Sequence, residues 1–249
     1  MTRIDLHVKI LGNGVVERAK RRGLDGLVYA PHFTRLPNIE RAAEAASDAD
    51  LTIYPAREIF TGPWWDRRHV LALGLQEPVP DFLPFETTLA ELERQDATVL
   101  VPHPTFFSVS LSESDIRTHR EMIHAIEIGN PKHLPVHTRR ARRLVAELGC
   151  PGFGSSYAHL PWTVGEFWTE FDIGVDHLDD LTAAIRNEEI RGIGRRNGIG
   201  HPARRAIEFA HLGWENSWEK FHRTVIAGQE PTHPMNPAYP ARFQEEFVG

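Results

Sequence analysis

The sequence predicts an α/β fold built on a largely parallel sheet. Short apolar segments alternate with amphipathic helical segments six or seven times along the chain, which is the pattern of strands joined by helical crossovers. The length of 249 residues suits one large domain, and single α/β barrels commonly reach this size. Periodicity alone leaves open whether the sheet closes as a barrel or stays open.

The expected elements follow from hydrophobic periodicity and from turn and capping residues. Thr88 with Glu91 predicts a capping box, and Ser112 predicts a helix N-cap. We expect strands at 4–9, 26–30, 51–59, 69–74, 98–101, 125–128 and 152–156, and helices at 15–22, 39–46, 88–95, 113–123, 138–148 and 179–187. Beyond these we expect two helices at 203–212 and 218–227, and an irregular tail at 231–249.

The first strand alternates strictly between apolar and polar side chains. The apolar residues from Ile4 to Val8 share one face, and Asp5, His7 and Lys9 share the other. In a barrel, the apolar face would contact the surrounding helices and the polar residues would point into a site. Asp5 would then orient the ring of His7. A solvent-facing edge strand explains the same pattern.

Composition narrows the classes of function. The net charge of -6 and the pI of about 6.2 argue weakly against nucleic-acid binding, which usually needs a basic face. They do not exclude a nucleic-acid substrate. The single cysteine, Cys150, allows no internal disulfide and no cysteine metal cage. We expect a cytoplasmic protein, because we find no signal peptide and no membrane-spanning apolar run. The 14 histidines stand out, since imidazole is the commonest metal ligand.

Metal-binding residue types recur where the expected strands end or begin. Strand ends meet at one rim of a barrel, and imidazoles with carboxylates suit zinc, manganese or iron. A bound divalent ion lowers the pKa of its water and polarises a phosphoryl oxygen. The candidates are His7, His32, Glu58, His69, His103, Glu127 and His159.

These residues lie in motifs that resemble the polymerase and histidinol phosphatase (PHP) family of metal-dependent phosphoesterases. The matching segments, in order, are Asp5-Leu6-His7-Val8-Lys9, Ala30-Pro31-His32, Glu58, His69 to Gly74, Pro102-His103-Pro104 and Ser155 to His159. The resemblance implies a distorted TIM-like barrel of seven strands and up to three metals. We expect this barrel in residues 1–200, with residues 201–249 as a helical extension and tail packed on it.

The sequence departs from the family motifs at three positions. Lys9 replaces the second histidine of Asp-Leu-His-x-His, and Pro31 and Tyr157 replace two aspartates. By resemblance, one metal position keeps all its ligands, and the chain would hold fewer than three ions. The intact set, in the second metal position, is Glu58, His69 and His103; the first position keeps His7 with Glu58, and the third keeps His32 and His159.

Two functions fit these observations. The first is a metal-dependent hydrolase, a phosphoesterase, that uses a metal-bound hydroxide at the rim and a small anionic or phosphorylated substrate. Its expected metal ligands are His7, Glu58, His69, His103 and His159, with His32 or His159 as acid or base and Lys9 holding substrate. The second is a catalytically silent barrel that serves as a binding or scaffold protein, as the lost ligands suggest. The sequence sets neither the substrate, the metal nor the oligomeric state.

Several side chains keep more than one interpretation. His32 and His159 suit a ligand, a substrate contact or a relic of a lost site, and Lys9 with Tyr157 also suits a structural hydrogen bond. Glu127 either supports the site or pairs with an arginine in the core. Arg57, next to Glu58 in the strand, is expected to point to the opposite face in a structural role. The arginines of 139–143 either steer an anion or form a solvated helix face.

Overall fold

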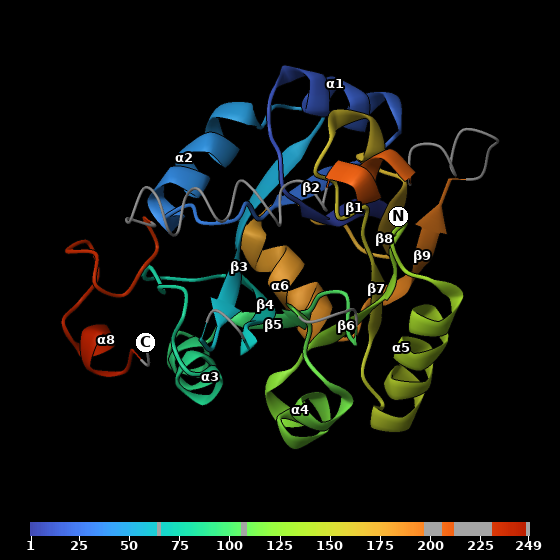
Figure 1. Cartoon of the computed structure of the whole chain (residues 1–249). Helices are drawn as coiled ribbons and strands as arrows, with labels where there is room; N and C mark the ends of the chain where they lie inside the picture. Colours follow the sequence, from blue (N-terminus) through green and yellow to red (C-terminus); the bar gives the residue numbers. More distant parts are fainter. Residues whose placement is uncertain (64–65, 106–108, 197–205, 212–230, 248–249) are drawn as a thin grey trace.

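A nearly closed, barrel-shaped sheet forms the centre of the molecule (Figure 1). The computed structural model describes residues 1–63, 66–105, 109–196, 206–211 and 231–247. The strands are β1 (Thr2–Val8), β2 (Gly26–Tyr29), β3 (Thr52–Thr61), β4 (Arg68–Leu73), β5 (Thr98–Val101), β6 (Ala125–Gly129), β7 (Gly152–Gly154), β8 (Phe167–Phe171) and β9 (Ile190–Arg195). Their order in the sheet is β7-β6-β5-β4-β3-β2-β1-β8-β9. The predicted α/β barrel is confirmed.

Strand β4 runs against both of its neighbours, so the predicted run of parallel strands is wrong at this point. It pairs antiparallel with β3 and with β5, whereas β1–β2, β2–β3, β5–β6 and β6–β7 are parallel. The reason is the short connection at 62–67, because a parallel neighbour requires a crossover of a dozen or more residues. The reversal places the start of β4 at the rim where the neighbouring parallel strands end.

Strands β8 and β9 were not predicted, and they bring the sheet to nine strands. Strand β8 pairs antiparallel with the first half of β1, and β9 pairs antiparallel with β8. The indole of Trp168 lies where a side chain on Gly194 would stand, at 1.9 Å from an added Cβ. Only glycine fits there, and the resulting Gly-x-Gly pattern obscured β9 in the sequence.

The gap between β7 and β1 closes through single contacts. A parallel bridge joins Val8 to Ala158, and the Lys9 N–H donates to the Ala158 carbonyl at 2.9 Å. Lower down, the Thr169 hydroxyl on β8 donates to the Gly154 carbonyl at 2.9 Å and accepts from the Gly154 N–H at 3.0 Å. The sheet is therefore a distorted barrel rather than an evenly paired cylinder.

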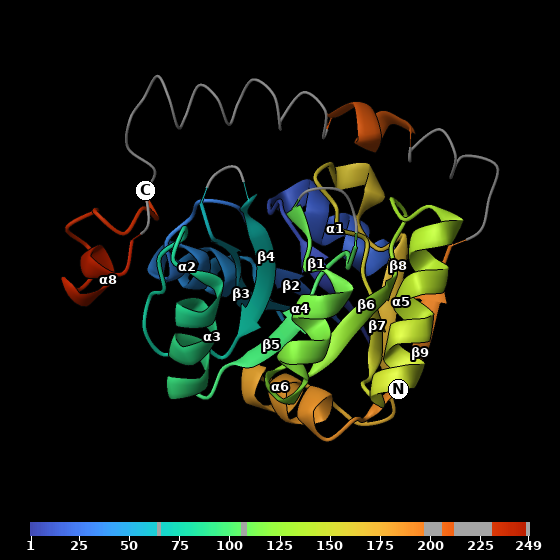
Figure 2. The same cartoon turned by 60° about the horizontal axis from the view of Figure 1, so that its bottom comes forward.

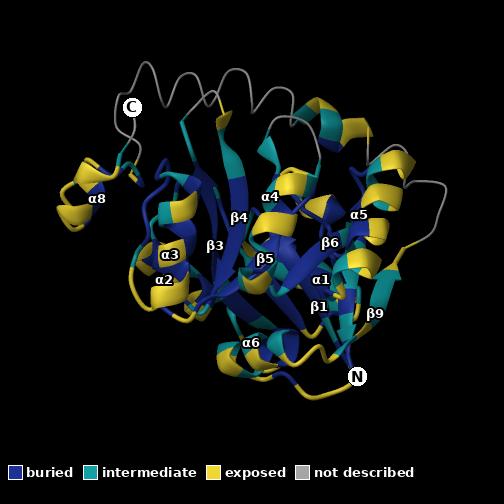
Figure 3. Cartoon of the chain, turned by 90° about the horizontal axis from the view of Figure 1, so that it is seen from below, coloured by how far each residue is buried: buried dark blue, intermediate teal, exposed yellow. Residues whose placement is uncertain are grey.

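Helices cover the outside of the sheet with their exposed faces turned to solvent (Figure 3). They are α1 (Asn13–Arg21), α2 (Leu36–Ala46), α3 (Phe85–Arg94), α4 (Glu113–Thr118), α5 (Pro135–Leu148), α6 (Leu178–Arg186) and the short α8 (Arg242–Glu245). Ser112 caps α4 in a capping box with Asp115, as its residue type predicted. The predicted box at Thr88 and Glu91 is wrong, because α3 already begins at Phe85 and the Thr88 hydroxyl donates to the Pro84 carbonyl.

Helix α6 covers the end of the barrel opposite the predicted ligands (Figure 2). The segment before it accepts hydrogen bonds from the first residues of the strands: Thr2 Oγ1 donates to the Ile173 carbonyl, and Tyr54 Oη to the Val175 carbonyl. Leu181, Ala184 and Ile185 of α6 join the apolar cluster inside the barrel. This end is therefore closed by packing, which leaves the other end for a site.

The first strand contains an irregularity that changes which side chains face inward. The register of β1 against β2 shifts between Asp5 and Val8. Ile4 and Leu6 belong to the apolar cluster inside the barrel, whereas Val8 packs with α1. The prediction that the apolar residues from Ile4 to Val8 would all face the helices is therefore wrong for Ile4 and Leu6. His7 and Lys9 do reach the site.

The described part of the C-terminal region contacts the barrel at two places. Residues 206–211 are helical, and most of the two predicted helices at 203–212 and 218–227 lies outside the described residues. The Asp81 N–H donates to the Thr232 carbonyl at 2.8 Å, and Tyr239 and Phe243 join the cluster that contains Phe85. Residues 231–247 are mainly turns, as predicted. The predicted domain boundary at residue 200 stays a prediction. In the described residues, no helix is long and apolar enough to cross a membrane.

Candidate metal centre

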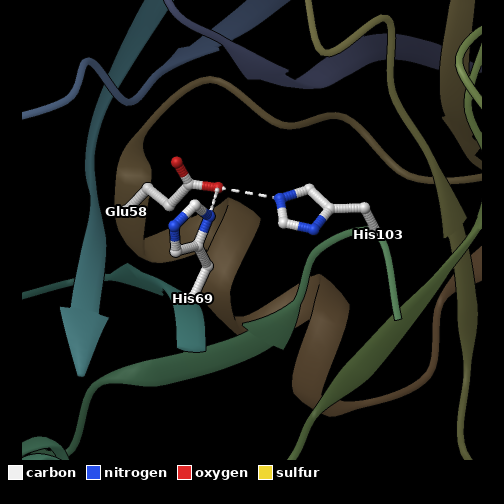
Figure 4. Close-up of side chains that lie close together, drawn as sticks. All are labelled: Glu58, His69 and His103. Carbon is white, nitrogen blue, oxygen red and sulfur yellow. Dashed lines mark hydrogen bonds and ion pairs between the residues drawn. The ribbon is translucent and has the colours of Figure 1, made fainter. Parts of the chain in front are cut away.

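The carboxylate of Glu58 lies at the centre of a buried cluster of imidazoles. Glu58 comes from the second half of β3, His69 from the start of β4 and His103 from just beyond β5 (Figure 4). All three side chains are buried, and one ligand atom from each lies within 4.8 Å of the others. Because β4 is reversed, a histidine at its start reaches the same rim as residues beyond neighbouring strand ends.

Three imidazole nitrogens surround one oxygen of this carboxylate. Glu58 Oε1 is 3.2 Å from His103 Nε2, 3.3 Å from His69 Nδ1 and 3.4 Å from His7 Nε2. Ligands about 2.0–2.1 Å from a zinc ion in tetrahedral geometry lie about 3.4 Å from one another. The distances of His103 and His69 from Glu58 Oε1 are therefore those of ligand atoms around a shared cation, and these three residues form the compact set.

The contacts of His103 place its Nδ1 against Ser110 and its Nε2 against Glu58. The Ser110 hydroxyl donates its proton to the His103 carbonyl at 2.6 Å, so its oxygen accepts from His103 Nδ1 at 3.0 Å. A neutral ring protonated at Nδ1 carries a lone pair on Nε2. His103 Nε2 lies 3.2 Å from Glu58 Oε1, and in that form of the ring a cation could bind to both atoms.

The other oxygen of Glu58 is held by Lys9 and His32. Lys9 Nζ contacts Glu58 Oε2 and donates to the Ala30 carbonyl at 2.7 Å, and His32 Nδ1 is 2.9 Å from Oε2. Burial alone would raise the pKa of Glu58, but the Lys9 ammonium and the imidazoles outweigh it and hold that pKa well below its usual value. Glu58 is therefore ionised, as a metal ligand must be.

Burial keeps His7 and His159 in the neutral form. It lowers the pKa of His7 well below the usual value, and the nearby Lys9 charge adds to the effect. Burial and then the charge of Lys132 do the same for the pKa of His159. Neutral imidazole is the form that ligates metals or exchanges protons near pH 7.

His159 lies in a second cluster, next to the first. Its Nδ1 is 2.8 Å from Lys132 Nζ, which also contacts the Tyr157 carbonyl and pairs with Glu208 Oε2 at 3.1 Å. His159 Nδ1 also lies 3.0 Å from the Tyr157 carbonyl; it accepts from the Lys132 ammonium in one tautomer of the ring and donates to that carbonyl in the other. The rings of His159 and His32 lie 5.9 Å apart, so His159 lies beside the first cluster.

Glu208 holds the helical segment 206–211 over this second cluster. Its Oε1 accepts from the His159 N–H at 3.2 Å, the Leu160 N–H at 3.1 Å and the Thr163 hydroxyl. Neither Glu208 nor Lys132 was predicted to take part in the site. Lys132 follows the Gly129-Asn130-Pro131 loop at the rim, and it is one of only four lysines in an arginine-rich chain; that scarcity was the available signal.

Glu127 fixes the ends of three strands below the site. It accepts from the His103 N–H at 2.7 Å, from Asn130 Nδ2 at 3.1 Å and from the Ser155 hydroxyl. With these partners Glu127 supports the site. The alternative expectation was that Glu127 pairs with an arginine. His103 stands on strained backbone with φ of 34°, and the bond to Glu127 helps to hold that conformation.

Asp5 does not orient the His7 ring, which was its predicted role. Its carboxylate accepts from the Ser156 N–H at 2.8 Å and the Gly165 N–H at 2.9 Å. Burial raises the pKa of Asp5 to about 6, against the lowering effect of these hydrogen bonds. Arg57 points away from Glu58 as predicted, because neighbours along a strand alternate; it is buried with Asp81.

Among the five predicted metal ligands, three form the compact triplet Glu58, His69 and His103. His7 approaches the same carboxylate oxygen, and His159 contacts Lys132 instead. The three predicted catalytic residues, Lys9, His32 and His159, all lie beside the triplet.

Comparisons with known proteins agree with the motifs. A family model described as PHP-associated matches residues 135–190. The chain superposes on a two-domain protein from Bacteroides vulgatus, described as containing a predicted PHP-like metal-dependent phosphoesterase, with a TM-score of 0.60 and 16% identity over 78% of this chain and 65% of that one. The chain has a PHP-like fold. Its resemblance to the PHP family, predicted from the motifs, is thereby confirmed.

Two further structures share this PHP-like barrel. PsfC from Pseudomonas syringae PB-5123 matches with a TM-score of 0.61 and 18% identity, over 85% of this chain and 100% of that one. Endonuclease Q, in complex with a 27-mer duplex carrying an abasic lesion, matches with 0.57 and 15%, over 75% and 56%. At these identities the likeness shows the fold alone. No curated protein sequence matches the chain.

Proposed function

We propose that this chain is a metal-dependent hydrolase of phosphate esters with one metal at Glu58, His69 and His103. The observation that carries the proposal is the buried triplet itself, in which His103 Nε2 lies 3.2 Å from Glu58 Oε1 and one ligand atom of each residue lies within 4.8 Å of the others. The third ligand, His69, lies 3.3 Å from the same oxygen. Three protein ligands with an open fourth position are typical of a catalytic zinc, and manganese and iron accept the same donors.

A divalent ion in this position would supply an activated water and would polarise a phosphoryl oxygen. The chain supplies the remaining groups. His159, whose pKa burial holds well below its usual value, would exchange a proton with the leaving-group oxygen. Lys9 fixes Glu58 and adds positive charge for an anionic substrate, and His32 lies between the carboxylate and His159.

The two buried lysines support a single ion rather than three. Lys9 contacts the Glu58 oxygen that a second metal would use, and Lys132 contacts Nδ1 of His159. Like charges a few ångströms apart in a buried site repel strongly. The two ammonium groups would then supply the positive charge that additional metal ions would otherwise provide. That charge suits a small substrate with a phosphate group.

The experiment is metal analysis of protein purified without added metal, combined with turnover of bis-p-nitrophenyl phosphate and p-nitrophenyl phosphate. We expect close to one equivalent of a divalent metal and hydrolysis that is lost on chelation and in His103→Ala. The matched control is His177→Asn, which removes an exposed histidine at the far end of the barrel and keeps a good N-cap residue for α6. It should retain both metal and activity.

A catalytically silent binding protein is the competing function, and the same experiment distinguishes it from the hydrolase. Less than a tenth of an equivalent of metal after incubation with zinc, manganese or iron, with no turnover in any of them, would refute the hydrolase. Turnover that depends on His103 would refute the silent barrel.

A further inference from the structure

A pocket on the outer side of the barrel lies between α5 and β9, apart from the triplet. It has a volume of about 580 Å³, which is within the range of small-molecule sites. Its polar lining comes from the start of α5, the loop after β6 and the end of β9, and consists of Asn130, His133, Thr138, Arg139, Arg142 and Arg195. The remainder of the lining is apolar or backbone.

The charge of this pocket has one sign. Three arginines line it and no aspartate or glutamate does. Within the described residues, no ion pair joins Arg139, Arg142 or Arg195 to a carboxylate, whereas the next arginine on the same helix, Arg143, pairs with Glu113 and Glu147. Three guanidinium groups converge on a hollow surface in a chain of net charge -6. This arrangement favours an anionic ligand.

The floor of the pocket is apolar and fixed. Ile128, Phe167 and Ile193 form it. They approach the backbone closely at Gly129, where an added Cβ would lie 3.0 Å from Ile193 Cγ2 and 3.1 Å from Phe167 Cδ1. An aromatic and two branched side chains suit the flat or apolar body of an organic molecule rather than a free ion alone.

We propose that this pocket binds a small phosphate monoester, with the phosphate on the arginines and the organic body on the apolar floor. Guanidinium forks match phosphate oxygens in pairs, and a phosphate carries charge of about -1.5 to -2, which suits three arginines better than a single carboxylate does. The inference does not depend on the proposed hydrolase, because none of the triplet residues lines the pocket.

The pocket shares a loop with the metal centre. Asn130 lines the pocket, donates to Glu127 Oε2 at 3.1 Å and accepts from the Lys132 N–H at 2.8 Å. Glu127 in turn accepts from the His103 N–H. A ligand that contacts Asn130 therefore contacts a residue that binds the Lys132 backbone directly and is linked to the His103 backbone through Glu127.

The test is calorimetric titration of the full chain with adenosine 5′-monophosphate, inorganic phosphate and adenosine. We expect saturable binding of the monophosphate, weaker binding of inorganic phosphate and none of adenosine. Arg139→Ala with Arg195→Ala should weaken monophosphate binding at least about tenfold, as the loss of charge-assisted hydrogen bonds implies. Both arginines are exposed, so the variant is expected to fold, and its thermal melt checks this.

Two controls separate this pocket from the metal centre. Arg140→Ala removes an exposed arginine of the same helix that does not line the pocket, and it should bind as the unmodified chain does. His103→Ala should lose metal and keep monophosphate binding. The proposal is overturned if the unmodified chain binds none of the phosphates, or if His103→Ala abolishes binding that the arginine variant retains.

Discussion

Lys9 Nζ contacts one oxygen of the Glu58 carboxylate, and three imidazoles surround the other oxygen. In the PHP motif that the chain resembles, a second histidine stands at this position. In this chain a positive charge in contact with the Glu58 carboxylate therefore stands where the motif has a histidine. The contact balances the buried charge of Glu58.

A histidine at position 9 should allow a second metal ion to bind. In Lys9→His we expect metal content to rise from about one equivalent towards two, because the repelling charge is gone and His7, Glu58 and the new imidazole provide a second set of ligands. Metal analysis after incubation with manganese or zinc measures the change. Lys20→His is the control, since Lys20 pairs with Asp48 on the surface; equal metal content in the two variants would show that Lys9 does not exclude an ion.

Ser110 and Ser112 allow a comparison of metal binding with stability. Ser110→Ala removes the acceptor for His103 Nδ1–H, and the loss of such a partner typically weakens metal affinity about 10–100-fold. Ser112→Ala removes the cap of α4, which costs about 1 kcal/mol of stability, and should leave metal affinity unchanged. Competition with a chromogenic chelator and thermal melts measure the two effects, and a common effect on both quantities would contradict the assignment.

His159 and His69 are expected to separate catalysis from metal binding. His159→Gln should keep its metal and lose about 10²–10⁴-fold in kcat, as removal of a proton donor does, because Nδ1 of His159 is taken by Lys132. His69→Gln should lose the metal itself. Metal content and kcat are measured on the same preparations; loss of metal from His159→Gln would make this residue a ligand instead.

The sequence predicted which residues cluster together better than it predicted the contacts that they make. Residue types at strand ends located Glu58, His69 and His103, because a barrel brings these ends together. The role of Asp5 was predicted incorrectly, since its hydrogen bonds run to backbone of residues 156 and 165, and pairings between distant segments leave no periodic pattern. Lys132 and Glu208 were missed for the same reason: 76 positions separate them, and only the fold brings them within 3.1 Å.

A buried pair on the other face of β3 supports the strand that carries Glu58. Arg57 donates to Asp81 Oδ1 at 3.0 Å and to the Thr34 carbonyl at 2.7 Å, and both charged side chains are shielded from solvent. Asp81→Ala should lower the free energy of unfolding by about 3–5 kcal/mol, because it leaves a buried charge without its counter-ion. The exposed pair of Arg191 and Asp172 is the control, and Asp172→Ala should cost less than about 1 kcal/mol. Urea unfolding followed by tryptophan fluorescence measures both, and equal losses would mean that Arg57 finds another partner or water once Asp81 is gone.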